Sequence, residues 1–165
     1  SFDERLAAAR KCRDAGFPIS FHIDPMIEHE GWQKNYLKLV EDICTEFKPS
    51  EIPYISIGTL RFQPEQRHMM RERFGGKSLI NRAELFPSHD GKYRYDQSLR
   101  EEMYKHVYSA FKENNKAWNV FLCMESPETW LASVDNTPKS AGGLTDLFNH
   151  NLIRKVNTIE NSMDS

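Results

Sequence analysis

Polar side chains alternate with apolar ones in the short segment 19–24. Period-2 geometry puts Ser20, His22 and Asp24 on one face of a strand and the apolar side chains on the other. A parallel strand covered by helices on both sides is apolar on both faces, so this pattern predicts a strand that borders a wet cleft. Imidazole and carboxylate groups there can bind substrate, transfer a proton or ligate a metal ion.

Two later strand-like segments also end in polar residues. Segment 54–58 leads into Thr59 and Arg61, and segment 119–124 leads into Glu125. Active sites of parallel α/β folds gather at the carboxyl ends of the strands. The alternative is that such side chains are structural and satisfied by their neighbours. We predict a pocket or cosubstrate site lined by His22, Asp24, Thr59, Arg61 and Glu125.

A metal site is a second interpretation of the same segment. His29 and Glu30 follow closely, and imidazole with carboxylate suits zinc, manganese or iron. These two residues are adjacent on an expected loop, however, and need not converge with the strand. The cysteines also lack the close spacing of a zinc or cluster motif, because they stand at positions 12, 44 and 123. The sequence therefore favours no metal ligands in this chain.

The segment 91–95 interleaves cations and aromatic rings. Asp90-Gly91 flanked by β-forming residues is typical of a hairpin tip. Alternation puts Lys92 and Arg94 on one side, and Tyr95 with its neighbouring tyrosine on the other. Such a hairpin can bind phosphates and stack against bases. An exposed hairpin whose long side chains merely reach solvent fits equally well.

Strands and helices alternate along the chain, which predicts an α/β fold of repeated βα units with parallel strands. We expect strands at 19–24 (closed by Pro25), 54–58, 79–86 and 119–124. One helix is expected at 32–47. Another is expected to begin at a capping box made by Ser98 and Glu101 and to end near 114, and its apolar stripe consists of Met103, Val107, Tyr108 and Phe111. We expect residues 1–134 to form the C-terminal half of a barrel and the polar segment 135–165 to be a tail, with one helix at most.

Composition narrows the class of protein. A chain of 165 residues is too short for a closed eight-stranded α/β barrel, which needs about 250. The formal net charge of −2 excludes a strongly basic nucleic-acid-binding surface over the whole chain, so any DNA contact must be local. No membrane span or signal peptide is expected, and three scattered cysteines fit a reducing cytoplasm.

The order and spacing of several short motifs across residues 1–134 resemble the spore photoproduct lyase family of radical S-adenosylmethionine enzymes. Each motif alone is weak, but their succession is fairly specific. The motifs are GFP at 16–18, FHIDP at 21–25, HEGW at 29–32, IGTLRF at 57–62, DGKYRY at 90–95 and CMESPE at 123–128.

The resemblance implies a partial TIM-type (β/α)6 barrel and a [4Fe-4S] cluster held by a CxxxCxxC motif in the first half of the protein. It implies reductive cleavage of S-adenosylmethionine to a 5′-deoxyadenosyl radical, which abstracts hydrogen from a thymine lesion flipped out of DNA. It also implies that the hairpin bearing Lys92, Arg94 and Tyr95 contacts the DNA.

Two departures from the family pattern matter. The CxxxCxxC motif is absent, so we expect a fragment that binds no cofactor by itself and has no catalytic residues of its own. Its expected partners are the missing N-terminal half and DNA, with self-association through the uncovered strand edge. The spore enzymes also tend to have apolar residues at the positions of His22 and Asp24, which points to the wider branch of the family and leaves the substrate open.

Two other functions stay open at this point. One is a fragment of a metal-dependent barrel hydrolase or isomerase that uses His22, Asp24 and Glu125. The other is a non-catalytic binding domain whose polar strand faces are simply hydrated.

Overall fold

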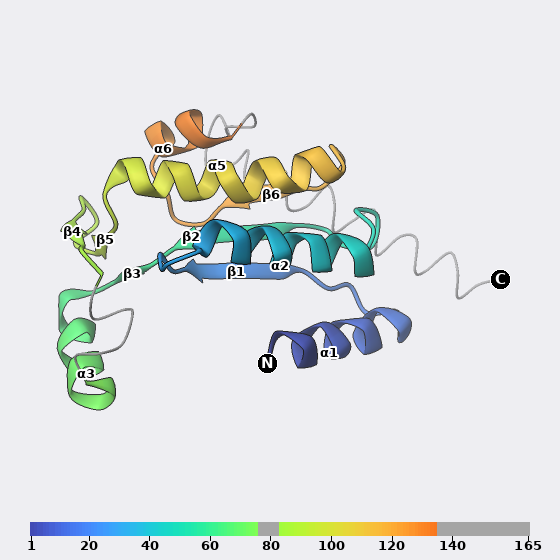
Figure 1. The fold of residues 1–165 in the computed structure, drawn as a ribbon, viewed down its shortest axis with the longest axis horizontal. Helices are drawn as coiled ribbons and strands as arrows, with labels where there is room; N and C mark the ends of the chain where they lie inside the picture. Colours follow the sequence, from blue (N-terminus) through green and yellow to red (C-terminus); the bar gives the residue numbers. More distant parts are fainter. Residues whose placement is uncertain (76–82, 135–165) are drawn as a thin grey trace.

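The computed structural model describes residues 1–75 and 83–134 and shows a mixed α/β protein (Figure 1). The chain begins with helix α1 (Phe2–Asp14), strand β1 (Phe21–Met26), helix α2 (Trp32–Glu46) and strand β2 (Ile55–Thr59). It continues with strand β3 (Arg61–Phe62), helix α3 (Pro64–Phe74), strands β4 (Phe86–Pro87) and β5 (Tyr93–Arg94), helix α5 (Gln97–Asn114), strand β6 (Val120–Leu122) and helix α6 (Pro127–Ser133).

The main sheet is parallel, as predicted, with strand order β1-β2-β6. Phe21 pairs with Ile55, which in turn pairs with Val120, so apolar positions are in register across the sheet. Parallel neighbours need a crossover connection, which α2 provides between β1 and β2 and α5 provides before β6.

Helix α5 packs against both α2 and β2 and provides much of the core. Its buried face contains the side chains expected from the helical spacing, together with a second tyrosine. They are Met103, Tyr104, Val107, Tyr108 and Phe111.

A second, antiparallel sheet has the order β3-β5-β4 and begins directly after the end of β2 (Figure 1). Strands β4 and β5 form the hairpin predicted around Asp90-Gly91, and the amide of Ser88 donates to the carbonyl of Lys92 across it at 2.8 Å. Arg61 pairs with Arg94 between β3 and β5. The hairpin is thereby attached to the carboxyl end of the main sheet.

Several sequence-based boundaries were wrong. Strand β1 does not close at Pro25 but continues to Met26, and the proline, which has no amide proton, lies where the register of β1 on β2 shifts. Helix α5 begins one residue after Asp96, which is its N-cap, and Ser98 only donates to that cap. The cause is that Asp96 offers a charged acceptor two residues earlier.

The third parallel strand expected at 79–86 is not seen in the described part of that segment. Phe86 instead belongs to β4, which pairs antiparallel with β5. Residues 79–82 and the predicted tail at 135–165 lie outside the described residues.

The expected polar strand faces are only partly present. His22 is exposed on β1, but every residue of β2, the central strand of the sheet, is buried, Ser56 included. Met124, the last residue of the strand expected at 119–124, is 59% exposed, because β6 ends at Leu122 and Met124 has a φ of 55°. No helix within the described ranges is long and apolar enough to cross a bilayer.

Candidate functional site

A bidentate ion pair joins Asp24 of β1 to Arg61 of β3. Nη1 of Arg61 donates to Oδ1 of Asp24 at 3.0 Å, and Nη2 donates to Oδ2 at 2.7 Å. The side chain of Arg61 is only 12% exposed and that of Asp24 only 18%. A bidentate pair of this kind is stronger than an ion pair joined by a single hydrogen bond. Burial lowers the pKa of Arg61, but the hydrogen bonds and charge of Asp24 outweigh it and raise the pKa overall.

Gly58 makes room for this pair. A Cβ atom at position 58 would lie 2.6 Å from Oδ2 of Asp24 and 2.7 Å from Nη1 of Arg61. Both distances are below any normal contact, so β2 needs glycine here for the pair to form over it.

Cys123, which follows β6, contacts the same guanidinium. Nη2 of Arg61 lies 3.4 Å from its Sγ. Burial raises the pKa of the Cys123 thiol, and the charge of Arg61 offsets only part of that rise. The thiol is therefore held in its protonated, weakly nucleophilic form.

Tyr104 links the ends of β2 and β6. Its hydroxyl accepts a hydrogen bond from the amide of Thr59 at 2.9 Å and donates to Oε1 of Glu125 at 2.8 Å. Thr59 is also tied to the ion pair, because Nη1 of Arg61 donates to its carbonyl at 3.1 Å. Burial, followed by the charge of Glu125, raises the pKa of Tyr104, which keeps the hydroxyl protonated and able to donate.

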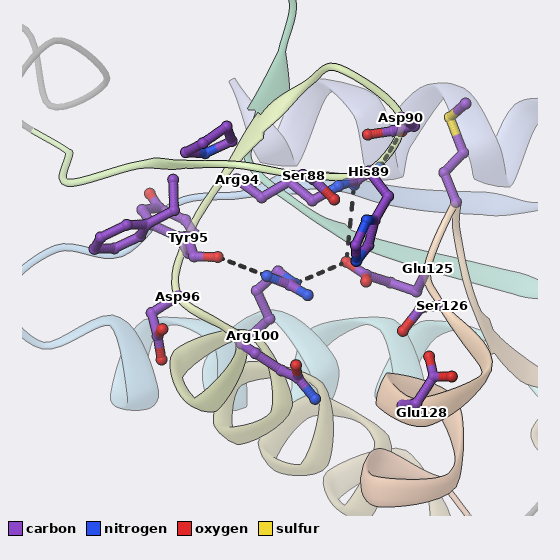
Figure 2. A pocket seen from close by; sticks show the side chains of 14 residues that line it. Ser88, His89, Asp90, Arg94, Tyr95, Asp96, Arg100, Glu125, Ser126 and Glu128 are labelled. Atoms are coloured by element: carbon purple, nitrogen blue, oxygen red, sulfur yellow. Dashed lines mark hydrogen bonds and ion pairs between the residues drawn. The ribbon is translucent and has the colours of Figure 1, made fainter.

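A cavity of about 840 Å³ lies beside Glu125 (Figure 2). The β4–β5 hairpin, the start of α5 and the turn before α6 form its walls. Arg100 of α5 places Nε 3.3 Å from Oε1 of Glu125, and Arg94 of β5 places Nη1 4.0 Å from the same oxygen. Three elements thus meet at one buried carboxylate.

The hairpin residues predicted to contact DNA differ in exposure. Lys92 is partly exposed, with its Nζ 3.7 Å from Oδ2 of Asp90. Arg94 is buried and donates to the same oxygen at 2.5 Å. Tyr95 is buried as well, and its hydroxyl accepts a hydrogen bond from the amide of Glu28 at 3.0 Å. A base-stacking role for Tyr95 stays a prediction, and it requires the ring to leave this position.

The structure connects most of the predicted pocket residues but not all. Asp24, Arg61, Thr59 and Glu125 form one chain of polar contacts through Tyr104. His22 does not take part in these polar contacts. Its ring contacts the ring of Tyr54 edge to face, with 5.9 Å between the ring centroids.

Sequence reasoning missed two residues of this network. Tyr104 lies on the apolar stripe of α5, and no local pattern distinguishes it from a core residue. Arg100 sits in the first turn of α5 and resembles an ordinary surface cation.

The residues that the structure describes do not fit an iron–sulfur cluster. Within residues 1–75 and 83–134, no three histidine, cysteine or acidic side chains converge as metal ligands. The cysteines lie apart, in α1, in α2 and after β6. His29 and His22 do not form a common metal site, because Nδ1 of His29 is hydrogen-bonded to the carbonyl of Glu30 at 2.8 Å.

Comparison with known proteins finds two relatives that carry the same name. The chain is 28% identical over 76 residues to the spore photoproduct lyase of Geobacillus sp. (strain Y412MC61) and 42% identical over 41 residues to that of Bacillus subtilis (strain 168). These matches cover 45% and 25% of this chain, but only 22% and 12% of the relatives.

Solved structures show the same fold. A spore photoproduct lyase mutant matches with a TM-score of 0.64 at 23% identity, over 74% of this chain and 38% of that one. Another mutant, with bound AdoMet and dinucleoside spore photoproduct, matches with a TM-score of 0.61 over the same shares. The chain therefore corresponds to well under half the length of these proteins.

The family model described as spore photoproduct lyase matches residues 1–120, which is most of the chain. This match shows that the chain belongs to the spore photoproduct lyase family.

Proposed function

We propose that this chain is the C-terminal part of a radical S-adenosylmethionine enzyme that repairs a DNA lesion by hydrogen abstraction. The family match over residues 1–120 is the observation that carries the proposal. The short share of each relative that is covered supports a larger parent protein, and the parallel sheet supports a place in a partial (β/α)6 barrel.

In this proposal, the polar network at the carboxyl ends of the strands forms part of the wall of the substrate and cosubstrate pocket. Asp24 and Arg61 neutralise each other and leave a rigid, hydrogen-bonded wall. Thr59 and Glu125 belong to the same wall, and exposed His22 lies on the face of β1. We propose that these residues bind and position the substrate and cosubstrate, and we assign no catalytic step to them.

The cluster itself belongs elsewhere in the parent protein. The described residues do not offer three converging thiolates, so we assign the [4Fe-4S] ligands to the part that precedes this chain. Bound S-adenosylmethionine would there supply the radical chemistry, and this chain would close the pocket.

The decisive experiment uses the full-length protein, purified without oxygen. We expect iron with sulfide, S-adenosylmethionine cleavage on reduction, and repair of an oligonucleotide that contains spore photoproduct. Zinc or manganese in place of iron would favour the metal-dependent hydrolase or isomerase, and the absence of any bound metal would favour a binding domain. Iron and S-adenosylmethionine cleavage without repair would retain the enzyme class and reject this lesion as the substrate.

We propose further that the β4–β5 hairpin faces the DNA, with Lys92 as its partly exposed cation. Arg94 and Tyr95 hold the base of the hairpin in this arrangement. Because each neutralised phosphate releases about one counterion, Lys92→Ala should reduce the slope of log affinity against log salt by about 1. Lys105→Ala, at an exposed position of α5, is the matched control and should leave the slope unchanged. An unchanged slope in Lys92→Ala would reject the assignment.

A further inference from the structure

Glu125 is one of the points at which the hairpin is joined to the rest of the molecule, in addition to the pairing of β3 with β5. Its side chain is 2% exposed, and it lies three residues after the end of β6 at Leu122. On one side, the hydroxyl of Tyr104 donates to Oε1 and ties the carboxylate to the end of β2. On the other side lie Arg94 and Arg100 (Figure 2).

Both arginines lead to the hairpin strand. Arg94 belongs to β5 itself. Arg100 belongs to α5, but its Nη1 donates to the carbonyl of Tyr95, the residue after β5, at 2.6 Å. Two consecutive residues of the hairpin are therefore connected to one oxygen of Glu125, the first directly and the second through Arg100.

We propose that Glu125 is a positioning residue that sets the place of the β4–β5 hairpin for contact with nucleic acid. The inference rests on the proposed function of the hairpin. It assigns no chemistry to Glu125, which is buried and faces arginine and tyrosine side chains.

Charge explains why the carboxylate is needed. Nη1 of Arg94 and Nε of Arg100 are buried and make no hydrogen bond within the described residues, so their charge is balanced across 3.3 to 4.0 Å by Glu125. Without that negative charge, the two guanidinium groups would retain only the exposed carboxylates of Asp90, beside Arg94, and of Asp96, which interacts with Arg100. A buried charge that loses its partner is strongly unfavourable.

The hairpin is the element that would give way. Each of its strands is only two residues long, and both residues of β4 are exposed. Helix α5 instead has five buried side chains in the core. Loss of the Glu125 charge should thus release the hairpin and leave α5 in place.

Hydrogen exchange of the full-length protein tests the positioning step without DNA. In Glu125→Gln, we expect amides of 86–95 to exchange about tenfold faster or more, while those of 103–111 keep the wild-type rate. Glu102→Gln, an exposed glutamate on α5, is the matched control and should change neither segment. Equal rates at 86–95 in wild type and Glu125→Gln would overturn the proposal, as would equal acceleration of both segments.

A second variant keeps the test valid if Glu125→Gln does not fold. Arg94→Gln removes the direct tie from the hairpin side and should accelerate the same amides. The double variant should exchange more slowly than the two single effects multiplied together, because both variants remove the same Arg94–Glu125 contact, while the Arg94–Asp90 pair is lost only in Arg94→Gln. Glu125→Asp, which retains the charge, should restore part of the protection. Additive effects or no restoration would contradict the inference.

DNA binding gives the functional measurement. A hairpin that is in place for less of the time weakens apparent affinity in proportion, so the Kd for Glu125→Gln should rise about threefold or more. If wild-type protein binds no DNA, the proposed function of the hairpin fails, while the exchange data still decide whether Glu125 holds it. A normal Kd with a released hairpin would reject the link to nucleic acid.

Discussion

Gly58 shows, at the scale of single residues, how the backbone permits the Asp24–Arg61 pair. A methyl group there would collide with Asp24 and with Arg61. We expect Gly58→Ala to lower the free energy of unfolding by about 1–3 kcal/mol, as overpacking does in other cores. Urea denaturation measures this change.

The Asp24→Ala background isolates the cause. With the carboxylate removed, most of the collision disappears, so Gly58→Ala should cost clearly less there than in the wild type. An equal cost in both backgrounds would mean that the ion pair is not what position 58 accommodates.

Cysteine reactivity provides a second test at this scale. Burial raises the pKa of the Cys44 thiol from about 9 to about 11, whereas Cys12 is exposed. Since the thiolate is the nucleophile, iodoacetamide at pH 8 should alkylate Cys44 at least about tenfold more slowly than Cys12. The raised pKa means that the rate at Cys44 should climb as pH approaches 11. Mass spectrometry of timed samples measures both sites, and equal rates in folded protein would contradict the expectation.

The sequence was informative at this scale wherever a residue ends a strand. Asp24, Thr59 and Glu125 could be placed near one another because parallel strands bring their carboxyl ends to one edge. Tyr104 and Arg100 could not, because their role depends on how α5 is oriented over the sheet. The burial of Arg94 and Tyr95 could not be predicted from the sequence either, because alternation in a hairpin does not indicate which side faces the protein.

At the scale of elements, the start of α5 depends on Asp96. Its Oδ1 accepts hydrogen bonds from the amide and the hydroxyl of Ser98, at 2.9 and 2.6 Å. We expect Asp96→Ala to lower Tm by roughly 2–4 °C. Ser98→Ala should have a smaller effect, because the charged acceptor remains. Differential scanning calorimetry distinguishes the two, and a larger effect at Ser98 would restore the capping box expected from the sequence.

The pH dependence of this cap follows from its charge. Hydrogen bonds from the side chain and then the amide of Ser98 lower the pKa of Asp96. A lowered pKa contributes stability above the ordinary value near 3.8, and that contribution is lost as pH falls through the folded-state pKa. The Tm difference between wild type and Asp96→Ala should therefore be full at pH 6 and should shrink below pH 4.

Long amphipathic helices were the most predictable elements, since their spacing and terminal residues are local signals. The extents of α2 and α5 match expectation within one or two residues. Strand β4 was misassigned because two-residue strands carry no periodicity, and pairing with β5 is decided by the hairpin. The same limit applied to β1, whose passage through Pro25 is allowed only by an irregular register.

At the scale of the whole molecule, the main sheet has outer strands at β1 and β6 among the described residues. An uncovered strand edge offers unpaired amides and carbonyls to another chain. In the proposed barrel, the missing N-terminal part would cover the edge of β1. The 165-residue chain by itself should consequently self-associate, with an apparent mass that rises with concentration in sedimentation velocity.

Two variants and one addition make this last prediction specific to β1. Lysine on an edge strand opposes strand pairing, so His22→Lys, at an exposed position of β1, should shift the chain toward monomer. His68→Lys on exposed α3 is the matched control and should leave the association unchanged. Adding the N-terminal part of the full-length protein should also dissociate the homo-oligomer, because that part competes for the same strand edge. A chain that stays monomeric at every concentration would argue that the β1 edge is already covered, and hence against a half-barrel with an open first strand.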